Sequence, residues 1–224
     1  MNSYRILRNE ERGVASHGWL NSHHSFSFAN YYNPEWMNFG ALRVINDDVV
    51  DGGRGFGAHP HDNMEIISIP LSGDLAHKDS QGNEKVIRCG DIQVMSAGTG
   101  IVHSEYNANK DAPVNFLQIW IIPNQRGVAP RYQQKSINFE KSRNHFLTLL
   151  SPDSTAEDSV WIHQDAYISL ATIDEHQSIA YQKHQENNGT FIFVLEGNVR
   201  VRNEALNTKD AIMFDDLNQF DVIT

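Results

Sequence analysis

The sequence predicts an all-β protein made of many short strands, and three observations carry this prediction. Apolar runs rich in β-branched residues recur at short intervals, with turn signals such as Gly73-Asp74 between them. The 3.6-residue spacing of amphipathic helices is scarce. The second half of the chain also repeats the first in outline, since PLSGDLA at 70–76 resembles VLEGNVR at 194–200. We therefore expect the chain to hold two copies of one β-fold.

The expected strands follow one another closely along the chain. The first lies at residues 4–7, and a half-buried strand is expected at residues 25–28, where serine and phenylalanine alternate. Later strands are expected at residues 41–45, 65–71, 86–87, 92–95 and 114–122. Asp47 and Asp48 are expected in a turn, and the polar residues 124–136 in a linker. This linker would separate an N-terminal domain, residues 1–135, from a C-terminal domain, residues 136–224.

Composition and charge exclude several classes of protein. The chain of 224 residues has a formal net charge of −10, so a basic surface for nucleic acid or an anionic membrane is not expected. Its single cysteine, Cys89, rules out an intramolecular disulfide and fits a reducing compartment. The N-terminal residues have no apolar stretch typical of a secretory signal. Apolar runs such as residues 116–122 are too short to span a bilayer, so we expect a cytoplasmic protein.

Two short motifs in the N-terminal half predict a metal site. His59 and His61 are separated by one residue, and so are His103 and Glu105. Residues i and i+2 of a strand share a face, so all four side chains can converge inside a small barrel. Pro60 has no backbone N–H to donate to a sheet ladder. Its strand is therefore expected at the edge of a sheet, or Pro60 is expected among the first residues of that strand. Three imidazoles and one carboxylate are ligands that Fe, Ni, Cu or Zn accepts, and Mn less readily.

The C-terminal half does not repeat these four residues. When the turn glycines of the two halves are aligned, the positions of the first pair fall on Lys183 and Gln185. A similar alignment on the later turn places Val222 and Thr224 where the second pair would lie. The sequence therefore predicts one metal site, in the N-terminal domain.

Longer segments around these residues resemble a known family. The spacing Gly53-x5-His59-x-His61-x3-Glu65 matches the first cupin motif, and residues 90–107 resemble the second. The segments HGWLNSHHSFSFANYYNP, LRVINDD, GFGAHPHDNMEII and MSAGTGIVHSEYN resemble those of pirins, a branch of two-domain cupins. The resemblance covers residues 10–135 well and is close to bacterial pirin-like proteins described as quercetin 2,3-dioxygenases. Ser96 departs from the general cupin motif, which has proline there, and two extra residues precede His103.

The resemblance implies a fold and a ligand set. Pirins are two cupin barrels, double-stranded β-helices of jelly-roll type, packed face to face with metal only in the N-terminal one. By motif position the metal ligands would be His59, His61, His103 and Glu105. Glu65 is a ligand in many other cupins, and here it is expected behind the ligands, with a fifth ligand and a surface or structural carboxylate as the alternatives. The resemblance favours Fe(II) over Ni, Cu, Zn or Mn.

The resemblance also implies an activity, the oxidative opening of the heterocycle of a flavonol such as quercetin by O2, with release of carbon monoxide. Flavonol and O2 would then be the partners. Glu105 is the expected proton acceptor, because it lies at the metal with a spare oxygen. A flat polyphenol needs an apolar pocket. Its expected lining residues are Phe28, Phe56, Met64 and Trp120.

A regulatory protein is the alternative interpretation. Some pirins are described as partners of transcription factors or metabolic enzymes, with the metal as a structural or redox-sensing element. A solvent-open pocket at the metal would favour the enzyme, and a closed cavity with a large exposed patch would favour the partner-binding protein. The family resemblance suggests a monomer or a weak dimer.

Overall fold

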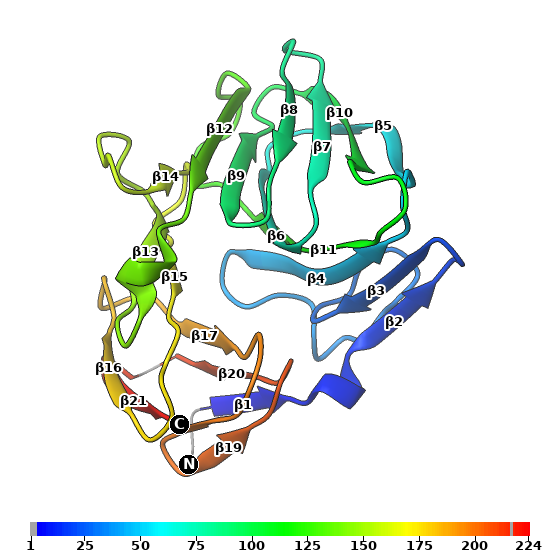
Figure 1. Cartoon of the computed structure of the whole chain (residues 1–224). Helices are drawn as coiled ribbons and strands as arrows, with labels where there is room; N and C mark the ends of the chain where they lie inside the picture. Colours follow the sequence, from blue (N-terminus) through cyan, green and yellow to red (C-terminus); the bar gives the residue numbers. More distant parts are fainter. Residues whose placement is uncertain (1–3, 216) are drawn as a thin grey trace. The chain divides into compact units, whose positions relative to one another are not determined.

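The computed structural model describes residues 4–215 and 217–224, and Figure 1 shows that strands dominate this part of the chain. The two helices in it are short 3-10 turns, η1 (Asn9–Glu11) and η2 (Phe139–Ser142). The prediction of an all-β fold is confirmed. No helix in the described residues is long and apolar enough to cross a membrane.

The chain divides into two compact units, each built from separate stretches of sequence. The first unit comprises residues 13–137 and 149–166. The second unit comprises the described residues up to Arg12 together with residues 138–148 and 167–224. This division falls after Ile137, close to the expected boundary at residue 135, but each unit also takes a segment from beyond it. The domain limits inferred from the sequence stay a prediction.

The first unit contains a seven-stranded and a four-stranded antiparallel sheet, which Figure 1 shows around a common interior. The larger sheet has the order β12 (Arg131–Ser136), β9 (Asp91–Ser96), β6 (Glu65–Ser72), β11 (Val114–Ile121), β4 (Leu42–Val50), β3 (Leu20–His24) and β2 (Gly13–Ser16). The smaller has the order β5 (Gly55–His61), β10 (Ile101–Asn107), β7 (Leu75–Asp79) and β8 (Glu84–Ile87). β14 (Val160–Trp161) pairs in parallel with the last residues of β13 (Leu147–Ser151).

Apolar side chains between the sheets hold the first unit together. One buried cluster includes Leu75, Val114 and Phe116, and another includes Ile66 and Met95. Burying each such side chain contributes about 2 kcal/mol before the entropy cost of ordering it. The central strands β6 and β9 are buried along nearly their whole length, which explains why Ile66 and Ile67 in β6, and Val94 and Met95 in β9, are apolar at successive positions.

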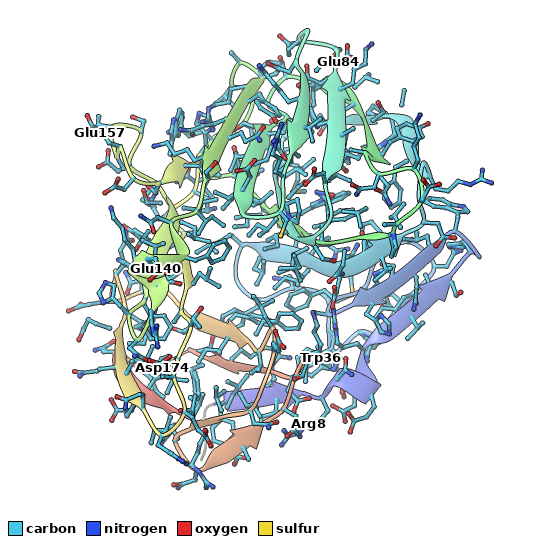
Figure 2. All side chains as sticks on the ribbon, in the orientation of Figure 1. Arg8, Trp36, Glu84, Glu140, Glu157 and Asp174 are labelled. Atoms are coloured by element: carbon cyan, nitrogen blue, oxygen red, sulfur yellow. The ribbon has the colours of Figure 1, made fainter. Side chains whose placement is uncertain are left out.

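Charged side chains mark the outer end of the smaller sheet. Figure 2 shows Glu84 there, and its carboxylate lies 3.2 Å from Lys78 Nζ across the β7–β8 hairpin. Both side chains are exposed, so this ion pair contributes little to stability.

Three local predictions were wrong. Residues 25–28 form no strand, although Phe26 is buried as the alternation suggested. Asp47 and Asp48 lie inside β4 and are buried, because Asn115 donates to Asp47 and Ser22 donates to Asp48. The second half of the expected linker is strand β12, whose polar side chains have specific partners. Arg131, for example, donates to the Trp161 carbonyl oxygen at 2.7 Å.

The second unit has two smaller antiparallel sheets. One has the order β1 (Tyr4–Leu7), β20 (Ala211–Phe214) and β17 (Thr190–Phe193). The other has the order β16 (Ser178–Gln182), β21 (Gln219–Ile223), β18 (Val199–Val201) and β19 (Glu204–Leu206). β15 (Ile168–Leu170) is a further short strand. The expected first strand is thus confirmed, and it pairs with a strand from the far end of the chain.

Gly98→Ala is expected to destabilise the protein by about 2–3 kcal/mol, lowering its unfolding midpoint by about 5 °C or more. Gly98 has φ +50°, and an added Cβ would lie 2.0 Å from the carbonyl oxygen of Val128. Thermal unfolding of the variant measures the effect. Gly57→Ala is the matched control, because an added Cβ there lies 3.9 Å from its nearest neighbour, the Tyr106 hydroxyl. Equal midpoints for the two variants would contradict the prediction.

Candidate metal centre

Strands β5 and β10 bring three of the predicted ligands together. In their antiparallel register His103 lies opposite His59, and Ile101 lies opposite His61. The ring centroids of the three histidines are 4.5–4.9 Å apart. Their ligand nitrogens lie within 4.8 Å of one another. The spacing of one residue within each motif therefore does place these imidazoles on one face.

Glu105 joins this group through a second set of side chains. A β-bulge separates it from His103 on β10, and its carboxylate forms a cluster with His103 and His77. The ligand atoms of these three residues also lie within 4.8 Å of one another, and all three residues are buried. The structure thus contains two overlapping triads that share His103, both within the first unit.

His77 is the site residue that the sequence interpretation missed. It lies on β7 directly opposite Glu105, while Asp79 lies opposite His103. Its Nε2 is 3.0 Å from the Asp79 carboxylate. The signal for it was present in the sequence, because His77 and Asp79 repeat the one-residue spacing of the two recognised motifs. The spacing alone does not show that β7 pairs with β10, and this pairing is what brings His77 next to Glu105.

The buried ring nitrogens of this centre lack partners, which tests whether a metal fits. Within the described residues, His61 Nε2, His77 Nδ1 and both ring nitrogens of His103 are buried without a hydrogen bond. His59 Nδ1 lies 2.7 Å from the Gly57 carbonyl oxygen, so this nitrogen carries the proton and Nε2 is left as a lone-pair donor. Unpartnered buried nitrogens cost stability, whereas a divalent ion would satisfy them. The donor set therefore fits a transition metal.

Burial sets the protonation of the same groups. Burial, together with the neighbouring His59, lowers the pKa of His61 to about 4. Burial also lowers the pKa of His103 to about 2, with added repulsion from His59, His61 and His77. Both imidazoles are thus neutral at pH 7, the form that binds metal.

A chain of hydrogen bonds holds Glu105 in place. Gln118 donates to the Ser68 hydroxyl at 3.0 Å, and Ser68 donates to Glu105 Oε1 at 3.0 Å. Burial raises the pKa of Glu105 to about 7, although the Ser68 hydrogen bond opposes the shift. The charge of Asp48 adds to the increase. The Glu105 carboxyl is therefore fixed in position and titrates near neutral pH.

Glu65 lies among different partners. Its carboxylate accepts a hydrogen bond from Ser96 at 2.6 Å and lies 3.1 Å from His163 Nδ1. Neither partner is one of the four predicted metal ligands. The role of Glu65 behind the ligands remains a prediction, and the structure gives Glu65 a contact with the segment 149–166.

Of the four predicted pocket residues, Trp120 lies next to His61, and Phe28 contacts Trp120 in turn. The rings of Trp120 and His61 are 4.9 Å apart, and Phe28 meets Trp120 edge-on at 5.4 Å. Met64 and Trp120 pack against the same apolar cluster. Phe56 instead meets Trp19 at 5.4 Å in another cluster. A cavity of about 350 Å³ also borders His61. Its lining residues include Pro60, Thr99 and Val102 but none of the four predicted pocket residues.

Known protein families match both halves of the chain. Residues 7–121 match the family described as Pirin. Residues 148–223 match the family described as Quercetinase C-terminal cupin domain. The expectation of two cupin domains is thereby confirmed.

Individual relatives cover most of the chain. The Escherichia coli K12 protein named quercetin 2,3-dioxygenase is 44% identical over 208 residues, which is 92% of this chain and 87% of that protein. A Caulobacter vibrioides protein named pirin-like protein is 40% identical over 201 residues, 90% of this chain and 86% of its own length. The crystal structure of the E. coli pirin YhhW in complex with nickel(II) is similar with a TM-score of 0.91 at 40% identity, covering 98% of this chain and 93% of YhhW.

The metal-free protein is expected to lose thermal stability as pH falls from 6.5 toward 4.5. Because the folded pKa values of His61 and His103 lie below the ordinary 6.5, the unfolded chain binds more protons there. The raised pKa of Glu105 acts in the opposite direction between pH 7 and 4.5. Thermal unfolding in a chelator at successive pH values measures the loss. His61→Gln should flatten the profile and Glu105→Gln should steepen it; three parallel profiles would contradict the assignment.

Proposed function

Because the chain belongs to the pirin family, we propose that it is a metal-dependent dioxygenase that opens the heterocycle of a flavonol such as quercetin with O2 and releases carbon monoxide. The main support for this proposal is the cluster of buried imidazole nitrogens that lack hydrogen-bond partners within the described residues and lie beside the Glu105 carboxyl. The name of the E. coli K12 relative, quercetin 2,3-dioxygenase, supports the choice of substrate class.

His59, His61, His103 and Glu105 would hold one divalent ion in this proposal. Neutral imidazoles and a carboxylate suit Fe(II), our first choice, and also Ni, Cu, Zn or Mn. The nickel(II) bound in YhhW supports a divalent ion in general. When bound, the ion supplies Lewis-acid chemistry that lowers the pKa of a coordinated hydroxyl group.

Glu105 is proposed as the acceptor of the flavonol 3-hydroxyl proton. Ser68 donates to Oε1, so Oε2 is the oxygen that can receive the proton. A pKa raised to about 7 suits this exchange, because a base is most effective when its pKa lies near the working pH. The Gln118–Ser68 hydrogen bond keeps the carboxyl from turning away during the transfer.

The aromatic residues next to His61 would hold the flat rings of the substrate. Phe28 and Trp120 meet edge-on, and aromatic rings of this kind are suited to contact with the flat rings of a polyphenol. The indole nitrogen of Trp120 is buried without a partner among the described residues, so it can donate to an oxygen of a bound polyphenol. The cavity beside His61 would give access to the centre. A pocket that reaches the solvent favours the enzyme over the partner-binding alternative.

The purified protein is expected to contain about one divalent ion per chain and to consume O2 with a flavonol. Elemental analysis followed by oxygen uptake with a flavonol panel, after reconstitution with Fe, Ni, Cu, Zn and Mn, tests both points. His103→Ala should lose most of the metal and the uptake, since His103 belongs to both triads. His184→Ala, a histidine of the second unit, is the matched control. No uptake with any reconstituted ion would overturn the dioxygenase proposal.

Glu105→Gln is expected to keep much of the metal but to lower kcat by about 100-fold or more. The amide retains the shape and the Ser68 contact, but it cannot accept a proton. Turnover with quercetin, normalised to measured metal content, checks the prediction. Ser68→Ala, which keeps the carboxyl and removes only its hydrogen bond, should cost less than Glu105→Gln. Full turnover in metal-loaded Glu105→Gln would contradict the role of Glu105.

A further inference from the structure

The cavity beside His61 lies where strands β5 and β7 end and β10 begins, and its volume is about 350 Å³. Because His61 is one of its lining residues, the cavity borders the candidate metal centre. The other lining side chains are of two main kinds. Oxygen atoms are presented by Asp62, Ser80 and Thr99, and apolar surface by Pro60, Ile101 and Val102.

Backbone hydrogen bonds hold two of the oxygen-bearing residues at the cavity. The Ser80 N–H donates to the Val102 carbonyl oxygen at 2.8 Å, and the Val102 N–H donates to the Ser80 hydroxyl at 3.1 Å. The Thr99 N–H donates to the Val128 carbonyl oxygen at 2.9 Å, in a turn that ends at Gly100 with φ +134°. Residues with side chains rarely adopt this φ, so glycine is what lets the chain turn directly into β10 and present Thr99 at the cavity.

These side chains have hydrogen-bonding capacity left for a ligand. The Ser80 hydroxyl accepts from Val102 but has no acceptor for its own proton within the described residues. In the same part of the chain, the Thr99 hydroxyl has no hydrogen-bond partner, and the Asp62 carboxylate has no ion pair and one long contact, 3.5 Å to the Asn63 amide. All three residues are exposed, so water competes for them and each hydrogen bond to a ligand adds a modest affinity.

The charge and the size of the cavity indicate a neutral, hydroxylated ring. No Lys or Arg lines it, and the Asp62 carboxylate disfavours an anionic group there. The volume of about 350 Å³ is near the lower end of the range of about 300–1,000 Å³ for small-molecule sites, so it suits one substituted ring better than a whole three-ring flavonol. The two oxygens of a carboxylate can accept from two adjacent hydroxyls, which a dihydroxyphenyl ring provides.

His61 borders two different spaces, which matches the shape of a flavonol. The rings of His61 and Trp120 are 4.9 Å apart, and neither Trp120 nor Phe28 lines the cavity. In a flavonol the 3-hydroxyl lies between the phenyl ring, on the neighbouring carbon, and the carbonyl of the fused rings. A 3-hydroxyl held at the centre therefore directs the two ring systems to different spaces. The oxygen-lined cavity is the space that suits the hydroxylated phenyl ring.

We propose that this cavity is a subsite for the dihydroxyphenyl ring of the flavonol, in which Asp62 accepts from the two adjacent hydroxyls and Ser80 and Thr99 are further hydrogen-bond partners. Val102, which is 43% exposed, supplies apolar surface that the ring covers. The inference rests on the proposed function and names the substrates that the site selects. These are flavonols with adjacent hydroxyls on the phenyl ring, and Asp62, Ser80 and Thr99 are the specificity-determining residues.

Binding of two flavonols to the zinc-loaded full-length protein tests the proposal without turnover, because zinc has no redox chemistry. Quercetin carries both phenyl hydroxyls, and galangin is the same molecule without them. Titration calorimetry should show that the wild type binds quercetin about 10-fold more tightly than galangin. Asp62→Asn should reduce this ratio to about 2-fold and Thr99→Val to about 5-fold, with the galangin affinity unchanged.

The matched control is Asp111→Asn, which changes an exposed carboxylate of the same unit that does not line the cavity. It should leave the ratio at the wild-type value. Elemental analysis of each variant confirms its zinc content, since Asp62 is next to His61 in the chain.

Three results would overturn the subsite. The first is equal affinity of the wild type for quercetin and galangin. The second is an unchanged ratio in both Asp62→Asn and Thr99→Val, which would place the ring elsewhere. The third is an equal loss of affinity for both flavonols in Asp62→Asn at full zinc content, which would be an effect on the centre through His61. A wild type with the expected ratio that consumes no O2 with any reconstituted ion would instead overturn the proposed function and leave the subsite standing.

Discussion

The register of strand β10 is the constraint on which the candidate centre depends. β10 lies between β5 and β7, so His103 faces both His59 and Asp79, and Glu105 faces His77. The hydrogen bonds of two ladders fix this register. A slip of one residue would turn every side chain of β10 to the opposite face, and His103 and Glu105 would then leave both histidine-containing triads. The positions of the donors therefore follow from backbone pairing, and their chemistry follows from burial.

The sequence predicted the centre as far as local spacing can reach. The His-x-His and His-x-Glu motifs needed only the two-residue period of a strand, and the structure brings their imidazoles together. His77 and Asp79 show the same period, but their meaning depends on which strand pairs with which. That pairing joins residues more than twenty positions apart, and no local pattern encodes it. The grouping of Glu105 with His77 was missed for the same reason.

The local errors in the fold share one cause, which is that polar residues gain partners from distant strands. Asp47 and Asp48 are typical turn residues, yet each lies in a buried strand because Asn115 or Ser22 donates to it. Strand β12 looks like a linker, but Gln134 donates to Asp91 and Arg131 stacks on the Trp161 ring 3.8 Å away. A polar composition therefore predicts an exposed loop correctly only where the polar side chains have no hydrogen-bond partners on distant strands. The apolar strands, which need no specific partner, were predicted well.

The interleaving of the two units bears on synthesis at the ribosome. The buried Glu65 carboxylate lies 3.1 Å from His163, which the chain reaches about a hundred residues later, so this contact in the first unit forms only once the segment 149–166 has emerged. Strand β1 can pair only later still, because its partner β20 ends at Phe214. Folding as each domain emerges is the usual order for multidomain chains. Here neither unit can close before most of the chain has been made.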